Sequence, residues 1–125
     1  MQRLKTRAQF QAVMAGATVS RTAHFALHRT GLAAGEELRL LFPLQVPWIG
    51  AVIPKRWARR AVTRNTLKRQ IYTVAQDFAA RLPVAAHVVR LRTGFDRQQF
   101  TSATSAALKQ AVRAELLQLF DGAAA

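Results

Sequence analysis

Hydrophobic residues recur along the chain in two patterns, one with the spacing of a helix and one with the alternation of a strand. Near the N-terminus, Phe10, Val13 and Met14 stand at relative positions i, i+3 and i+4. Thr6 precedes them and stands three residues before Gln9, which is the spacing of a capping box. This segment therefore predicts a short helix that packs through its apolar face.

Three segments are typical of strands, and a further short apolar run lies among them. In the first, Phe25 and Leu27 fall on one face, while His24 and His28 fall on the other. The second is almost entirely apolar and is stopped by Pro54. The strands are predicted at 24–30, 48–53 and 87–92, and the extra run lies at 38–42.

Two longer helices are predicted in the second half of the chain. The first covers about 61–80 and carries an apolar stripe along one face. The second is predicted to begin at Asp96, which stands three residues before Gln99, and to run to about Phe120. The stripe of the first helix consists of Leu67, Ile71, Val74 and Phe78.

The order of these elements predicts an α/β or α+β fold, in the form of a two-layer sandwich. About four strands would form one small sheet, and about three helices would pack on it. The strand–helix–strand unit between Trp48 and Leu91 predicts a parallel strand pair joined by a crossover helix. We expect one domain over residues 1–121 and a frayed tail at 122–125.

Charge distinguishes this chain from an ordinary globular domain. It carries 19 Lys and Arg residues against 6 Asp and Glu residues, a formal net charge of +13 on 125 residues. A small domain usually stays within about 8 charges of neutrality, and repulsion of this size is tolerable when a polyanion neutralises it. Nucleic acid is therefore the first candidate partner, and an anionic membrane surface is the second.

Membrane insertion and export are not indicated by the sequence. No segment approaches the roughly 18 uninterrupted apolar residues of a membrane-spanning helix. The basic N-terminus lacks the apolar region of a secretory signal, and the absence of cysteine suits a reducing compartment. A mitochondrial-type presequence is an alternative for the first residues, although Phe10, Val13 and Met14 suit a helix of the fold better. We expect a cytoplasmic protein with no membrane partner.

The positive charge is concentrated in the middle of the chain. Between Glu37 and Asp77 there is no acidic residue, so 8 of the 19 basic residues have no carboxylate nearby in sequence. On a helix with about 100° per residue, Arg64, Lys68 and Arg69 span about 140°, whereas the apolar stripe lies between about 280° and 340°. One face of this helix is thus predicted to pack on the sheet, and the other to present cations to solvent.

These cations favour RNA over DNA as the partner. A solvated basic face is the ordinary alternative, but such a helix usually contains interspersed carboxylates, and this one has none before Asp77. Guanidinium groups suit phosphates, and Asn65 can hydrogen-bond to backbone or base. The sequence lacks zinc-finger spacing, a zipper and a phosphate-binding glycine loop. The pattern therefore fits contact with a folded RNA, and we expect no DNA partner.

The sequence offers little of the chemistry that a self-sufficient nuclease needs. Its 6 acidic residues are scattered, so no carboxylate cluster for a metal ion is predicted. His24 and His28 would stand about 13 Å apart along one strand, and His87 has no partner nearby in sequence. We expect no catalytic residue, no metal site and no bound cofactor in the protein itself.

Residues 50–69 read Gly-Ala-Val-Ile-Pro-Lys-Arg-Trp-Ala-Arg-Arg-Ala-Val-Thr-Arg-Asn-Thr-Leu-Lys-Arg. This segment resembles the signature of the protein subunit of bacterial ribonuclease P, in which an apolar strand, two basic residues and a short loop precede Ala-Val and then Arg-Asn-x-x-Lys-Arg on a helix. The other predicted elements come in the family's order, so the resemblance covers nearly the whole chain. It implies a small α/β sandwich with a left-handed βαβ crossover, whereas the general expectation is right-handed.

The resemblance also implies a function. The chain would be the RNA-binding subunit of a ribonucleoprotein that removes the 5′ leader from precursor tRNA, with catalytic Mg²⁺ held by the RNA subunit. It would contact that RNA through the basic segment and bind the single-stranded leader in a cleft between the first helix and the sheet. The implied RNA-binding residues are Lys55, Arg56, Arg59, Arg60, Arg64, Asn65, Lys68 and Arg69. The implied cleft residues are Phe10, Met14, Ala26, His28 and Ala61.

The chain departs from the family pattern at several positions. Thr66 and Tyr72 stand where many members have arginine, and Met14 and His28 stand where many have an aromatic residue. Two alternatives to the ribonuclease P function stay open at this point. One is a ribosomal or assembly-type RNA-binding protein with a structural role, and the other is an endonuclease that cleaves RNA without an RNA subunit.

Overall fold

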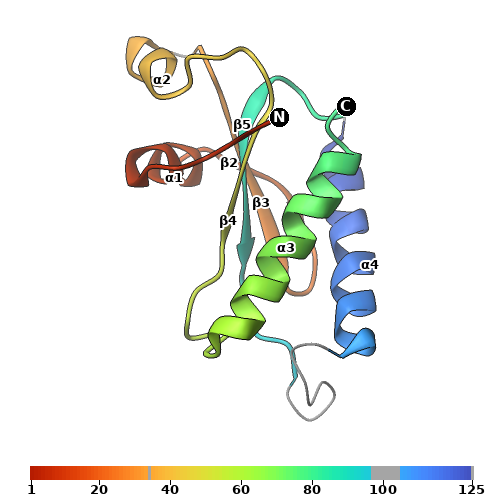
Figure 1. The fold of residues 1–125 in the computed structure, drawn as a ribbon. Helices are drawn as coiled ribbons and strands as arrows, with labels where there is room; N and C mark the ends of the chain where they lie inside the picture. Colours follow the sequence, from red (N-terminus) through yellow and green to blue (C-terminus); the bar gives the residue numbers. More distant parts are fainter. Residues whose placement is uncertain (34, 97–104, 125) are drawn as a thin grey trace.

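A five-stranded sheet forms the centre of the protein (Figure 1). The computed structural model describes residues 1–33, 35–96 and 105–124. The strand order is β1-β4-β5-β3-β2. β4 pairs in parallel with both β1 and β5, whereas β3 pairs antiparallel with both β5 and β2. The strands are β1 (Gln2–Arg3), β2 (Ala17–Arg21), β3 (Phe25–Gly31), β4 (Trp48–Val52) and β5 (Ala85–Leu91).

Helices cover both faces of this sheet. The two long helices, α3 (Ala61–Asp77) and α4 (Ala106–Ala123), lie side by side on one face, and the short helices α1 (Arg7–Met14) and α2 (Glu36–Leu41) lie on the opposite side (Figure 1). The apolar core is accordingly divided into two clusters, of which the larger lies between the sheet and the long helices. None of the helices in the described residues is long and apolar enough to cross a membrane.

The predicted fold class is confirmed, including the parallel pair formed by β4 and β5. The described residues contain five strands and four helices, rather than about four and three. Two layers were expected, but short helices also cover the second face of the sheet. β1 was not predicted because it has only two residues. β2 was not predicted because none of its residues is fully buried, so the segment shows no clear apolar alternation. The apolar run at 38–42 is mostly helical, and α2 has Glu36 and Glu37 in its first turn, where carboxylates favour a helix.

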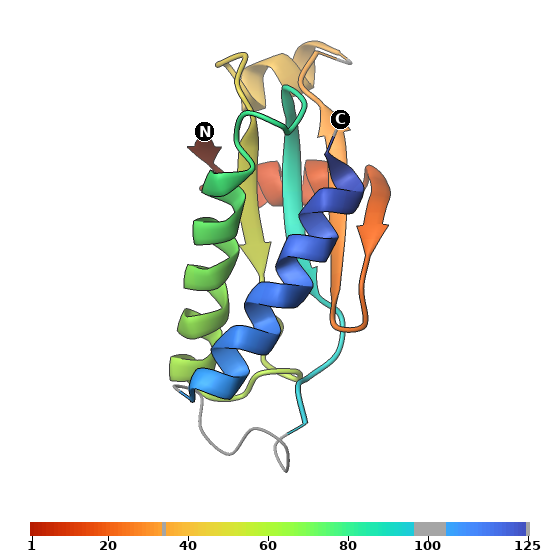
Figure 2. The same ribbon diagram turned by 90° about the vertical axis from the view of Figure 1, so that its right-hand side faces the viewer.

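The crossover from β4 through α3 to β5 is left-handed. In Figure 2, α3 lies in front of the sheet, β4 and β5 both run downward, and β5 lies to the right of β4. If the view is rotated so that both strands run upward, the chain passes from β4 to a strand on its left, which is the opposite of the usual hand. The hand that the family resemblance implies is therefore the one observed.

Helix α1 begins with the predicted capping box. The Thr6 hydroxyl accepts a hydrogen bond from the Gln9 backbone N–H (3.1 Å), and Gln9 Oε1 accepts one from the Thr6 N–H (3.1 Å). Gln9 Nε2 also donates to the Leu41 carbonyl (2.9 Å), which ties α1 to the end of α2. Val13 is fully buried against the sheet, so the predicted apolar face of this helix is confirmed.

The last helix differs from its prediction at both ends. Its N-cap is Ser105, whose hydroxyl accepts from the Leu108 N–H (3.1 Å), so Asp96 does not begin the helix, and Gln99 lies outside the described residues. Its end lies beyond the predicted Phe120, because α4 continues to the buried Ala123, so the first two residues of the expected tail are helical. A Cβ on Gly122 would lie 2.8 Å from the Ser20 hydroxyl oxygen, so glycine here allows α4 to approach β2 closely.

Candidate nucleic-acid interface

Helix α3 separates an apolar face from a polar one, as its sequence predicts. Leu67, Ile71 and Val74 are almost completely buried in the larger core cluster. On the other side of the helix, the side chains of Asn65 and Lys68 are exposed. The face that carries the amide and the cations is therefore directed away from the sheet, and only Tyr72 at its edge also packs against the larger core cluster. We call it the α3 face, and it consists of Asn65, Lys68, Arg69 and Tyr72.

A shallow groove of about 710 Å³ runs along the α3 face. Among the described residues, Asp77 is the only acidic one that lines it, and Asp77 Oδ2 already lies 3.4 Å from Arg113 Nη2 on α4. The electrostatic potential of this groove is thus positive, which suits a phosphate backbone. The groove is lined by Arg3, Asn65, Lys68, Arg69, Tyr72, Thr73, Gln76 and Asp77.

Arg64 is placed differently from the other cations of the helix. It is half-buried, and its Nη1 donates to the carbonyl oxygens of Ala58 (3.0 Å) and Arg59 (2.7 Å). These carbonyls belong to the basic loop, residues 55–60, that precedes α3. Arg64 therefore holds the basic loop against the helix, and only the part of its guanidinium that these two bonds leave free could contact a ligand.

The basic loop itself is anchored from within. Pro54 forms a turn in which its carbonyl accepts from the N–H groups of Trp57 (3.0 Å) and Ala58 (3.2 Å), and Ala58 is buried in the core. The Trp57 ring remains 37% exposed, with the Arg56 guanidinium 5.2 Å from its centroid. The loop thus presents its cations from a defined backbone. The exposed cations are Lys55, Arg56, Arg59 and Arg60.

A second candidate surface lies on the sheet face beneath α1. Phe10 and Met14 are both half-buried along this helix. The Phe10 ring lies directly over Gly50 of β4, since a Cβ at that position would come within 2.6 Å of Phe10 Cε1. A glycine is therefore required for the ring to rest on the sheet. We call the surface formed by α1 and the neighbouring sheet positions the cleft.

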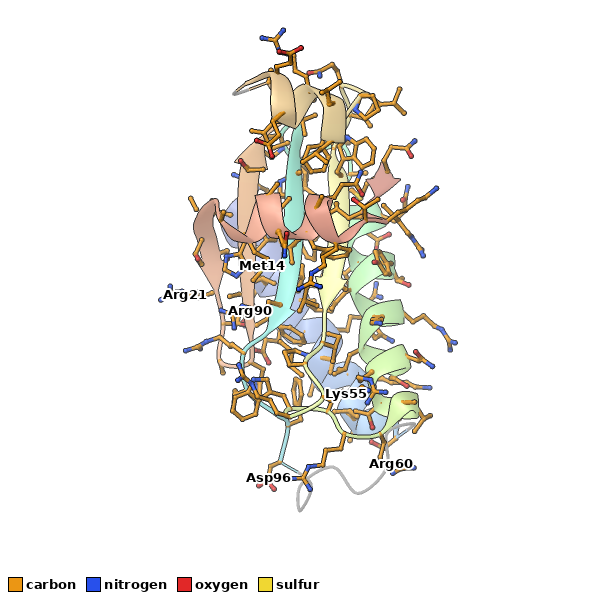
Figure 3. The ribbon with its side chains drawn as sticks, turned by 90° about the vertical axis from the view of Figure 1, so that its left-hand side faces the viewer. Met14, Arg21, Lys55, Arg60, Arg90 and Asp96 are labelled. Carbon is orange, nitrogen blue, oxygen red and sulfur yellow. The ribbon has the colours of Figure 1, made fainter. Side chains whose placement is uncertain are left out.

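Strand register places polar residues on the cleft floor. His28 pairs with Val88, which belongs to the core cluster on the α1 side, so His28 faces the same way. Ala26 pairs with Arg90 two positions along, and therefore shares that face. Figure 3 shows Met14, Arg90 and Arg21 near one another on this side of the molecule. Two arginines thus lie beside the apolar residues of the cleft.

His28 positions Arg90, and its own ring is not exposed for contact with a ligand. Its side chain is buried, its Nε2 accepts from Arg90 Nε (3.2 Å), and its Nδ1 lies 3.2 Å from the Thr18 hydroxyl. Burial lowers the pKa of His28, and the charges of Arg90 and Arg21 lower it further. The ring is therefore neutral, and Nδ1 carries the proton that it donates to Thr18.

The remaining predicted cleft residues are less closely associated with α1. Ala26 is almost completely buried, so its methyl group forms part of the floor rather than a contact surface. Ala61 is the first residue of α3 and follows Arg60, which lies far from Met14 in Figure 3. The structure thus groups Ala61 with the basic loop and Phe10, Met14, Ala26 and His28 with the cleft.

Arg90 and Arg21 are cleft residues that the sequence analysis did not select. The alternation of the predicted strand at 87–92 already placed Arg90 on the face of Val88. Arg21 lies in β2, where no strand was predicted. Arg3, which lines the groove on the α3 face, was missed because β1 contains only two residues.

The polar residues that might have suggested catalysis have structural partners. Glu115 Oε2 lies 2.8 Å from His24 Nδ1, and its Oε1 accepts from the Thr22 hydroxyl (2.6 Å), so Glu115 ties α4 to the turn between β2 and β3. His87 is fully buried between the Trp48 carbonyl and Arg29. Among the described residues, no three His, Cys, Asp or Glu side chains are grouped in a way that could hold a metal ion.

A sheet with a cationic helix face on one side and a cationic, partly apolar cleft on the other defines a nucleic-acid-binding protein. The family model described as Ribonuclease P matches residues 1–116. The chain is 36% identical over 114 residues to the ribonuclease P protein component of Bordetella parapertussis, covering 91% of this chain and 85% of that protein. It is also 36% identical over 104 residues to that of Burkholderia mallei strain SAVP1, covering 83% and 68%. The chain belongs to the ribonuclease P protein family.

Solved structures show the same fold. The ribonuclease P protein of Staphylococcus aureus superposes with a TM-score of 0.69 at 17% identity, covering 97% of this chain and 94% of that one. The protein from Thermotoga maritima gives 0.62 at 18% identity, covering 92% and 95%. The family model and the sequence relatives confirm the predicted function as the RNA-binding protein component of a tRNA-processing ribonucleoprotein endonuclease. A ribosomal or assembly role is not favoured.

Proposed function

We propose that this chain assists tRNA processing through two separate surfaces. The α3 face and the basic loop would bind the RNA subunit, and the cleft would bind the single-stranded 5′ leader of precursor tRNA. The RNA subunit would hold the Mg²⁺ ions and carry out the cleavage. The observation that supports this division is the placement of the helices, because α1, which borders the cleft, and α3, which carries the groove cations, lie on opposite sides of one sheet (Figure 1).

The chemistry of the α3 face suits a folded RNA. Lys68 and Arg69 project from a rigid helix, and helical spacing sets the distances between their charges. Double-helical RNA is recognised mainly through its shape and phosphates, which a rigid set of cations can match. The N-terminus of α3 has no side-chain cap, so its free N–H groups add positive potential next to the basic loop.

The chemistry of the cleft suits a single strand. Unpaired nucleotides bind where an apolar or aromatic platform lies beside cations, because a base can stack while its phosphate is neutralised. Phe10 and Met14 offer the partly exposed apolar surface. Arg90 lies near Met14 (Figure 3), and its Nε donates to His28 Nε2, which sets its direction. This surface accepts different bases, since it offers stacking more than hydrogen-bond readout.

Precursor tRNA cleavage at low Mg²⁺ concentration tests this proposal. We would compare the RNA subunit alone, the protein alone and the two together, using a precursor with a leader several nucleotides long. The account predicts cleavage by the RNA subunit that the protein accelerates, and none by the protein alone. Cleavage by the protein alone, or an RNA reaction that the protein leaves unchanged, would contradict it. A cytoplasmic location belongs to the same proposal, because bacterial tRNA precursors are processed there.

A further inference from the structure

We propose that the surface that binds the RNA subunit extends from α3 onto β1, where Arg3, held on the ring of Tyr72, binds a backbone phosphate of the RNA. This inference rests on the proposed function and adds a contact that lies outside the signature segment. It assigns the role to a two-residue strand at the N-terminus and to an aromatic residue of the helix.

The first observation is a row of positions on α3. Residues 64, 68 and 72 follow one another at intervals of four, so their side chains lie in line along the helix. Arg64 and Lys68 are cations, but the third position is Tyr72. The guanidinium carbon of Arg3 lies 3.9 Å from the centroid of the Tyr72 ring. A positive charge is therefore present at the third position, supplied by another element.

The second observation is that the backbone on both sides of Arg3 is held. The Gln2 N–H donates to the Pro47 carbonyl (3.0 Å), and the Leu4 N–H donates to the Ile49 carbonyl (2.9 Å). Leu4 is buried in the cluster on the α1 side of the sheet, so strand alternation directs Arg3 to the α3 side. β1 thus places the side chain, and the Tyr72 ring positions its guanidinium.

The third observation is the environment of the guanidinium. Arg3 lines the same groove as Lys68 and Arg69. Within the described ranges, the ion pairs are His24–Glu115, Arg81–Asp121 and Arg113–Asp77, so none of these three groove cations forms an ion pair there, and Asp77, which also lines the groove, is paired with Arg113. A guanidinium stacked on a ring keeps its N–H edge free, and that edge matches the oxygens of a phosphate. Three cations converging on one groove fit a stretch of RNA backbone.

The test measures the affinity of the full-length protein for the ribonuclease P RNA of Bordetella bronchiseptica, a relative's organism, over a range of salt concentrations. Arg3→Gln should weaken binding about tenfold, the scale of one charge-assisted contact. It should also reduce the log–log salt slope by roughly 0.7–0.9, the contribution of one phosphate. Arg39→Gln is the matched control, because it removes one charge from an exposed position on α2, on the other side of the sheet.

Variants of the ring test the positioning role of Tyr72. Tyr72→Phe keeps the stacking surface and should bind as the parent does. Tyr72→Leu should weaken binding less than Arg3→Gln does, and adding it to Arg3→Gln should cause no further loss. A thermal melt of each variant shows whether the fold is intact. If Tyr72→Leu unfolds the protein, Arg3→Lys replaces it, because lysine keeps the charge without the planar stacking group and should recover only part of the affinity.

The outcomes separate this inference from the proposed function. A parent protein that fails to bind the RNA would overturn the proposed function. A parent that binds, with Arg3→Gln no weaker than Arg39→Gln, would overturn the present inference alone. Equal losses in both variants would show a general effect of net charge and would overturn it as well. A Tyr72→Leu loss that adds in full to that of Arg3→Gln would show that the ring does not act through Arg3.

Discussion

The two faces of the sheet are covered to very different extents. On one face, α3 and α4 run along the strands and enclose the larger core cluster, which includes Phe25, Leu67 and Phe120. On the other, α1 crosses the strands and covers only part of them (Figure 3). Because α1 crosses the strands, it covers only the diameter of a helix along each of them, about 10–12 Å, whereas the seven-residue strands β3 and β5 extend over about 23 Å. The uncovered part of the sheet is where the cleft lies.

This difference separates stability from binding. The closed face contributes most of the buried apolar surface, and its rigid outer side carries the α3 face. The open face buries less apolar surface, and it leaves Met14 and Arg90 partly exposed, where a flexible strand of RNA can contact them.

The largest expected effect is on the closed face. Leu67→Ala removes a side chain that is 1% exposed in the core, so it should lower the free energy of unfolding by about 2–5 kcal/mol. Lys68→Ala, one position away and exposed, is the matched control and should change stability by less than about 0.5 kcal/mol. Urea denaturation of both variants measures the difference. Equal losses would show that the two sides of α3 are wrongly assigned.

The second prediction concerns acid. Burial lowers the pKa of His87 from 6.5 to about 4. The hydrogen bond to the Trp48 carbonyl opposes this shift, and the charge of Arg29 lowers the pKa further. Because the folded pKa lies below the unfolded one, the unfolded chain binds the proton first, and stability falls as the pH drops from 6.5 towards 4. The loss should reach about 3 kcal/mol. Urea denaturation between pH 7 and pH 4 measures it, and His87→Gln should make the curve flatter. A parent whose stability is unchanged over this range would contradict the prediction.

The third prediction concerns the open face. Phe10→Ala should weaken binding of precursor tRNA to the assembled enzyme by about 1–3 kcal/mol if the ring stacks on one base, and it should leave mature tRNA unaffected. The Phe10 ring also packs over Gly50 of the sheet, so a thermal melt must accompany the binding assay. A folded variant that still distinguishes precursor from mature tRNA as well as the parent would remove Phe10 from the leader site.

The smallest expected effect distinguishes Arg64 from Lys68. Arg64 donates to two carbonyls of the basic loop, so Arg64→Ala should cost about 1 kcal/mol of stability as well as RNA affinity. Lys68→Ala should reduce RNA affinity and leave the melting temperature unchanged. Hydrogen exchange at the amides of residues 55–60 would show whether the loop loosens in the Arg64 variant alone. Loosening in both variants would show that Arg64 does not hold the loop.

The parts of this molecule that were predictable are those whose signal is local. The stripe of α3 and the capping box of α1 each depend on residues close together in sequence. The parallel pair was predictable because the order of strand, helix and strand is itself visible along the chain. The basic residues of the signature segment were identifiable for the same reason. Arg64 shows the limit of such a signal, because helical spacing places it on the solvent side while its hydrogen bonds direct it to the loop.

The parts that were missed depend on tertiary proximity. β1 is a strand only because β4 lies beside it, so two residues carry no pattern of their own. The pairing of Arg3 with Tyr72, and of Arg90 with His28, joins residues far apart in the chain. The start of α4 was misplaced because Asp96 and Ser105 are both good capping residues, and the local sequence does not select between them; the N-cap is Ser105.

The measurement that tests the central claim most directly is a comparison of Lys68→Gln with Arg90→Gln in the assembled enzyme. Binding of precursor and mature tRNA would be measured over a range of protein concentrations. The account predicts that Lys68→Gln requires more protein for assembly but keeps the preference for precursor once assembled. It predicts that Arg90→Gln assembles normally and loses part of that preference at every protein concentration. If both variants change only assembly, or both change only the preference for precursor, the two surfaces do not have separate binding functions, and the account is wrong.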